Sequence, residues 1–236
     1  MNPPQFSALP TILFLVITLF VFVANVQGLV VGLRGIRHPN YTSMLYLAIL
    51  GMFFWLGGLL LLSTNGFFAH FETLPPRITL ALAVPLFVTL FLTIKRSFGE
   101  FLDVLHPAPL IYLQTFRVLV EVVLWLHYRD GNCPEQMTFE GWNFDIVAGI
   151  TAPIAGWLAF GSGRENRKLA IVWNFIGIGL LLNIIGTAIL SLPQFGVFSP
   201  PNYMIAYWPM VWLPGFVAPF ALMLHLFSLR QFFRIP

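Results

Sequence analysis

Ionisable and amide side chains interrupt one long apolar stretch, and they are the most chemically informative feature of the sequence. Arg117 and Glu121 lie between Pro109 and Tyr128, with Gln114 just before them. On a helix, residues four apart share a face, so Arg117 and Glu121 can pair, and Gln114 lies on the same side. A charge at membrane depth costs roughly 2.5–3.5 kcal/mol to insert, so these residues indicate either a packing contact or a ligand or ion site.

Other apolar runs carry polar groups at a comparable expected depth, namely Asn183, Thr151 and Tyr207. We expect these side chains to line an outward-facing pocket. In that pocket Arg117 would anchor an anionic group, and Glu121 would orient Arg117 or exchange a proton. Each of the three polar residues alone also fits an ordinary hydrogen bond between transmembrane helices.

A polar segment precedes the apolar run that starts at Phe144, and it contains Glu140, Asn143 and Asp145. Asn143 or Asp145 can cap that helix by accepting hydrogen bonds from its first N–H groups, and acidic groups suit its positive end. The functional alternative is that Glu140 and Asp145 belong to the pocket and close over a ligand.

Histidines suggest two further kinds of chemistry. His70 and His127 are expected on the outer side with Glu140 and Asp145, and two imidazoles with a carboxylate can hold a catalytic zinc ion. No H-E-x-x-H pair is present, so zinc stays an alternative, with His70 and His127 as its ligands.

A haem ligated by His106 and His225 is a second alternative, because imidazole is an ordinary axial ligand. Both residues are expected near the inner surface. Cys133 is the single cysteine, so the chain can form no internal disulfide. We predict no cofactor.

The elements that carry these residues are membrane-spanning helices. Hydrophobic residues make up 58% of the 236 residues and charged residues 9%, with a mean hydropathy of +0.84, which excludes a soluble globule. A helix needs about 20 apolar residues to cross the hydrocarbon core. Seven runs approach or exceed that length, and they predict one all-α domain over residues 1–236, a bundle with spans at 9–33, 42–64, 78–94, 109–128, 144–160, 169–192 and 203–229.

Basic residues predict the orientation of this bundle, because Lys and Arg concentrate in cytoplasmic loops. With the N-terminus outside, two basic residues fall on the outer side, Arg77 and Arg129, and Arg117 lies within a span. The other nine fall on the inner side: Arg34, Arg37, Lys95, Arg96, Arg164, Arg167, Lys168, Arg230 and Arg234. We therefore expect the N-terminus outside and the C-terminus in the cytoplasm.

Two local patterns modify the seven spans. Apolar residues recur at helical spacing after Lys95, which predicts a short helix lying on the inner surface, through Phe98, Phe101, Leu102 and Leu105. Prolines interrupt the last span and predict bends, with Pro214-Gly215 as a gating point, at Pro209, Pro214 and Pro219.

The stretch from Gln114 to Pro153 contains Arg117, Glu121, Thr138-Phe139-Glu140-Gly141 and Asn143-Phe144-Asp145. With these residues it resembles an uncharacterised family of small bacterial polytopic membrane proteins. The likeness covers roughly a sixth of the chain, and it implies a bacterial inner (cytoplasmic) membrane without implying an activity.

Other seven-span families match in outline alone. Microbial rhodopsins share the span number and the outside N-terminus, but the last span here has no lysine for a Schiff base. Ceramidase-type hydrolases share only the span number. Transporters with three spans, a linker span and three more share the topology without a sequence match between the halves.

The leading hypothesis is a non-enzymatic membrane protein whose pocket binds a small or amphipathic molecule, such as a lipid, for transport or sensing. The alternatives are an intramembrane metal-dependent hydrolase, a haem-binding protein and a partner subunit of a larger complex. Nucleic acid is not expected, because the 12 Lys and Arg form no basic run. The lipid bilayer is the expected surrounding, and a homo-oligomer stays open.

Overall fold

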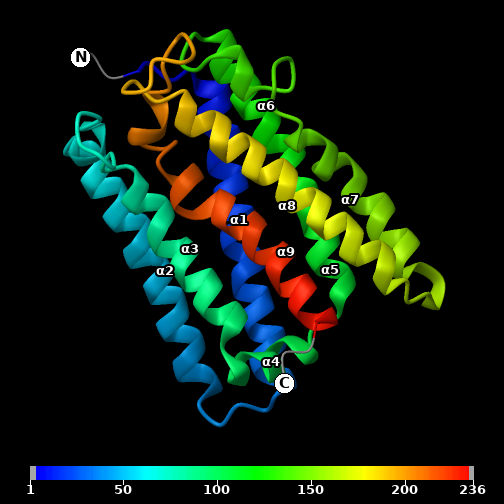
Figure 1. The fold of residues 1–236 in the computed structure, drawn as a ribbon. Helices are drawn as coiled ribbons and strands as arrows, with labels where there is room; N and C mark the ends of the chain where they lie inside the picture. Colours follow the sequence, from blue (N-terminus) through cyan, green and yellow to red (C-terminus); the bar gives the residue numbers. More distant parts are fainter. Residues whose placement is uncertain (1–3, 234–236) are drawn as a thin grey trace.

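The computed structural model describes residues 4–233, and within them every regular element is a helix. The elements cross between the two ends of an elongated bundle, with the start of α1 and the end of α9 at opposite ends (Figure 1). The α-helices are α1 (Ala8–Gly35), α2 (Tyr41–Thr64), α3 (Thr79–Ile94), α4 (Arg96–Asp103), α5 (Pro107–Tyr112), α6 (Phe116–Arg129), α7 (Asp145–Phe160), α8 (Arg167–Leu190) and α9 (Ala218–Phe232).

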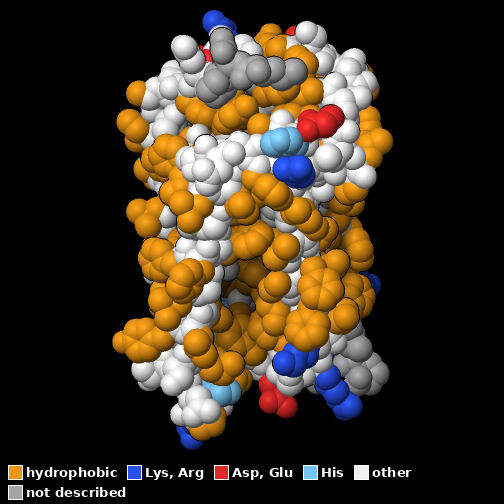
Figure 2. Space-filling model, turned by 90° about the vertical axis from the view of Figure 1, so that its left-hand side faces the viewer, with side chains coloured by type: hydrophobic (Ala, Val, Ile, Leu, Met, Phe, Trp, Pro, Cys, Tyr) orange, Lys and Arg blue, Asp and Glu red, His pale blue; other side chains and the backbone are white. Residues whose placement is uncertain are grey.

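The surface of the bundle is apolar over most of its length. Figure 2 shows hydrophobic side chains across the middle of one face, with the visible charged side chains mostly toward its two ends. Many large hydrophobic side chains are exposed, such as Phe54 at 78% and Leu47 at 69% on α2. Such a surface suits a hydrocarbon solvent, and it agrees with the composition of the chain.

The helix lengths confirm an all-α protein with several membrane-crossing helices. Within residues 4–233, six helical segments are long and apolar enough to cross a membrane. The third expected span is α3, which has only 16 residues and is followed by α4 at a bend of 82°; counting this pair as one span makes the number seven. The helix predicted after Lys95 is confirmed as α4, which buries Phe101 and Leu102.

The last expected span, 203–229, is wrong in its first half. Residues 203–212 form a 3-10 turn, η5 (Met204–Ala206), and further turns, and regular helix starts only with the π-helical segment η6 (Leu213–Val217) that leads into α9. Pro209 and Pro214 each lack an N–H, so a continuous α-helix through them would lose hydrogen bonds. The fourth span stays one helical segment, Pro107–Arg129, in which a 3-10 turn, η2 (Leu113–Thr115), separates α5 from α6.

Helix α7 starts inside the bundle. The indole Nε1 of Trp173 on α8 donates to Thr151 Oγ1 on α7 at 3.0 Å, so these two residues lie at one level. Thr151 is 6 residues after the start of α7, and Trp173 is 17 before the end of α8. Helix α8 therefore extends about 11 residues, roughly 16 Å, beyond the start of α7. The connection between α6 and α7, which contains η3 (Glu135–Met137), packs along this extra length of α8.

One inner basic residue of the orientation argument, Arg234, lies outside the described residues. The others lie at or near the ends of α1, α3, α4, α8 and α9 or in the α7–α8 connection. The acidic and polar segment Cys133 to Phe144 connects α6 to α7 at the opposite end of α7 from that connection.

Candidate functional site

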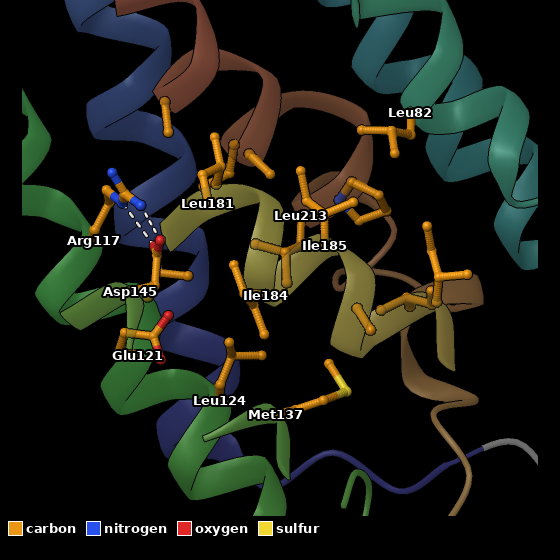
Figure 3. Close-up of a pocket in the computed structure, with 18 of the residues that line it drawn as sticks. Leu82, Arg117, Glu121, Leu124, Met137, Asp145, Leu181, Ile184, Ile185 and Leu213 are labelled. Atoms are coloured by element: carbon orange, nitrogen blue, oxygen red, sulfur yellow. Dashed lines mark hydrogen bonds and ion pairs between the residues drawn. The ribbon is translucent and has the colours of Figure 1, made fainter. Parts of the chain in front are cut away.

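A partly open cavity of about 120 Å³ lies among α3, α6, α8 and the η6–α9 segment. Its walls are mostly aliphatic, and they include Leu82, Val120, Leu181, Ile184, Leu213 and Val217. Three charged residues also line it, Arg117, Glu121 and Asp145, and Figure 3 shows them together on one side of the space, facing the apolar side chains. The cavity is therefore apolar along its length and charged at one place.

Arg117 is paired with Asp145 rather than with Glu121. The guanidinium makes a two-pronged contact, with Nε donating to Asp145 Oδ2 at 2.7 Å and Nη2 donating to Oδ1. Both side chains are almost fully buried, at 2% and 5% exposed. The expected pairing with Glu121 is corrected because α7 starts deep in the bundle, which brings its first residue beside the guanidinium.

His225 lies on the other side of Arg117 and continues the hydrogen-bond network toward α8. Arg117 Nη1 lies 2.9 Å from His225 Nε2, and His225 Nδ1 lies 2.8 Å from Asn174 Oδ1. Asn174 Nδ2 donates to Ser228 Oγ and to the Ala170 carbonyl, so its Oδ1 must be the acceptor. These partners assign the proton of a neutral His225 to Nδ1 and the lone pair to Nε2.

Glu121 is held from the α6–α7 connection. Asn143 Nδ2 donates to Glu121 Oε2 and also, at 2.9 Å, to the Met137 carbonyl. The Oδ1 atom of Asn143 accepts from the backbone N–H of Asp145 at 3.0 Å. Asn143 thus has part of the capping role expected of it, and it also links both acidic residues of the site.

Gln114 is completely buried in the η2 turn, just before α6. Its Nε2 donates to the Ala221 carbonyl of α9 at 2.9 Å, and its Oε1 has no hydrogen-bond partner among the described residues. Gln114 therefore joins α9 to the η2 turn, and it does not line the cavity.

The other predicted pocket residues lie elsewhere. Asn183 is exposed on the outside of α8, and Glu140 is exposed in the α6–α7 connection. Thr151 bonds Trp173 and the Val147 carbonyl, and Tyr207 is half-buried in the turns before η6. None of these four lines the cavity. Of the eight expected pocket residues, Arg117, Glu121 and Asp145 do so.

The structure does not assemble the zinc site that was the alternative interpretation of His70 and His127. Among residues 4–233, no group of three or more His, Cys, Asp or Glu side chains is placed to hold a metal ion. His70 is exposed beside the Gly66 carbonyl, and His127 is buried with its ring edge against Phe6. Asp145 is fully engaged by Arg117.

The histidines proposed for haem are also occupied differently. His106 is exposed and caps α5 by accepting from the Ala108 N–H. Both ring nitrogens of His225 have polar partners, Arg117 and Asn174, so no lone pair is left for iron. His225 therefore belongs to the buried polar network and not to the inner surface.

Sequence reasoning missed His225, Asn174 and Ser228 as members of the site. Asn174 lies within the sixth expected span and His225 within the seventh, so the rule that marks polar residues inside spans applies to both. What the rule cannot supply is the pairing, since it depends on how α8 and α9 are rotated against α6.

The region that matches a known protein family includes most of the bundle. The profile of the family described as "Domain of unknown function (DUF8737)" matches residues 75–233, which contain α3 to α9 and every residue of the polar network. No curated protein matches the chain, and no solved structure matches it. Since the matched region exceeds half of the sequence, the chain belongs to this family of unknown function.

Proposed function

We propose that this protein binds an amphipathic molecule inside the membrane, with the apolar part in the cavity and the polar end beside Arg117, Glu121 and Asp145. The observation that carries this proposal is the composition of the cavity wall. Apart from those three residues and Thr79, every lining residue is apolar. Ligand pockets combine such apolar walls with a few placed polar groups that fix the orientation of the ligand.

The setting we propose is a bacterial inner membrane with the N-terminus outside. The basic residues support this orientation through their concentration near one end of the bundle. Met137, Leu192 and Ile205 come from connections or helix ends at the other end, and they also line the cavity. In the proposed orientation the cavity therefore extends toward the outer face.

Native mass spectrometry of the gently solubilised protein tests ligand binding. We expect the wild-type protein to retain a lipid or small amphipathic molecule. Ile184→Trp should abolish retention, because Ile184 lines the cavity and is 9% exposed, so the larger indole fills the space. Ile176→Trp is the matched control, since Ile176 lies on the same helix at 56% exposure. Equal retention by both variants would rule out this cavity as the binding site.

Transport is a second candidate function, and the helix breaks beside the cavity favour it. The π-helical segment η6 contributes Leu213, Pro214 and Val217 to the cavity wall. Interrupted helices at membrane depth are typical of transporters, in which they line substrate sites. Flux of the retained molecule into vesicles containing the purified protein would establish transport, whereas binding without flux would favour sensing.

A further inference from the structure

We infer that the polar end of the bound molecule is an organic cation and that the Glu121 carboxylate binds it. This inference rests on the proposed function and adds the chemical class of the ligand. It starts from the charges around the cavity. Arg117 and Asp145 neutralise each other in a two-pronged pair, and His225 accepts from Arg117 as a neutral imidazole.

Glu121 is the carboxylate left without a cationic partner. Within the described residues the ion pairs join Arg117 to Asp145 and Arg167 to Glu165. Glu121 is in neither pair. Its one hydrogen bond comes from the neutral amide of Asn143 and goes to Oε2. A carboxylate offers about four acceptor sites on its two oxygens, so Oε1 is available to a donor in the cavity.

An anionic head group finds little support at the same place. A guanidinium has five N–H donors, and four of them are used by Asp145, His225 and the Gly177 carbonyl. Arg117 therefore keeps a single donor, and an anion near it would also meet the charge of Glu121. We therefore propose a cation in place of the expected anionic group at Arg117, because the charge of Arg117 is already paired with Asp145.

The rest of the cavity suits the apolar part of such a cation. Its wall follows α8 from Leu181 to Ile189, a length of about 12 Å. No second free carboxylate lines it, and the described residues form no metal-binding group, so a bare metal ion would lack ligands. A protonated amine on an alkyl chain satisfies both parts, with N–H donors for Glu121 and carbon for the aliphatic wall.

A series of ligands with one chain and three head groups tests this inference. We would measure the affinity of butylammonium, butanol and butanoate for the wild-type protein at neutral pH in an uncharged detergent, because a four-carbon chain suits a cavity of about 120 Å³. A charge-assisted hydrogen bond contributes about 1.5–3 kcal/mol, so we expect butylammonium to bind roughly 10-fold or more tightly than butanoate. Tighter binding of butanoate would overturn the cation assignment and leave the binding cavity in place.

Two variants test whether Glu121 is the residue that prefers the cationic ligand. Glu121→Gln keeps an oxygen for Asn143 and removes the charge, so it should weaken the affinity for butylammonium roughly 10-fold and change the affinity for butanol less than about twofold. Glu140→Gln removes an exposed carboxylate outside the cavity and should change neither affinity. Equal losses in both variants would contradict the role of Glu121. If none of the three ligands competes with the retained molecule in folded wild-type protein, the proposed function itself fails.

Discussion

Arg117 shows how a single residue organises the interior of this protein. Its side chain is 2% exposed, and the guanidinium contacts Asp145 of α7, His225 of α9 and the Gly177 carbonyl of α8. Burial of a charge is costly unless it is paired and hydrogen-bonded, and here the partners come from three helices. Arg117 is therefore held by partners within the bundle, and under our inference Glu121 is the residue that contacts the ligand.

For single residues, we predict that breaking the buried Arg117–Asp145 pair strongly destabilises the protein. Asp145→Asn leaves Arg117 buried without its counter-charge, so the free energy of unfolding should fall by about 3–5 kcal/mol. Glu165→Gln is the control, because it breaks the exposed pair with Arg167, at 58% and 62% exposure, and should cost under about 1 kcal/mol. Denaturant unfolding of both variants in detergent measures the difference. Similar losses would show that the buried pair contributes no special stability.

At the scale of elements, small residues let α8 and α9 approach closely. Gly177 is buried on α8, and a Cβ atom at this position would lie 2.6 Å from His225 Nε2. Gly32 of α1 has the same relation to α4, since a Cβ there would lie 2.7 Å from Cδ2 of Phe101. Small residues at helix interfaces are typical of membrane bundles, in which close packing replaces the hydrophobic effect.

We predict that Gly177→Ala destabilises the protein, while Gly179→Ala on the same helix does not. The new methyl group at 177 forces His225 away from Arg117, and overpacking of this kind costs about 1–3 kcal/mol. A Cβ at 179 meets no atom within 4 Å, so the higher helix propensity of alanine should keep or slightly raise stability. Thermal unfolding followed by circular dichroism compares the two. A stable Gly177→Ala would mean that α8 and α9 can shift without cost.

The connections before and after α7 lie at opposite ends of the molecule and differ in charge and contacts. The α6–α7 connection, which holds Glu121 through Asn143, lies at one end of α7, and the α7–α8 connection with Arg164 and Glu165 lies at the other. Under the proposed orientation the first faces outward and the second faces the cytoplasm. Under that orientation, the connection that holds Glu121 and the concentration of basic charge lie on opposite sides of the membrane.

Labelling with a membrane-impermeant maleimide tests this orientation. Glu140→Cys should react in intact cells, and Glu165→Cys should react only after permeabilisation; the reverse pattern would contradict the proposed topology. Cys133 provides a silent background, because burial, and secondarily the charge of Glu121, raises its pKa to about 12. The thiolate is the reactive form, so at pH 7.5 Cys133 stays protonated and unlabelled in the folded protein. Wild-type protein, whose single cysteine is Cys133, is the control and should stay unlabelled.

The sequence by itself determined the class of the protein and most helix limits. Runs of about 20 apolar residues define membrane-crossing helices because the hydrocarbon core has a fixed thickness. The fifth and sixth expected spans differ from α7 and α8 by no more than two residues at any end. The last span was mispredicted because hydropathy measures how apolar a segment is, whereas prolines and packing decide whether it is helical.

The tertiary structure alone decided the partners in the site. The spacing within α6 predicted that Arg117 could pair with Glu121, since residues four apart share a helix face. The choice of Asp145 depends on the axial position of α7, and the contacts with His225 and Asn174 depend on the rotation of α8 and α9. Periodicity fixes faces and depths within one helix. Stagger and rotation between helices follow from side-chain packing of the whole bundle, which no single segment contains.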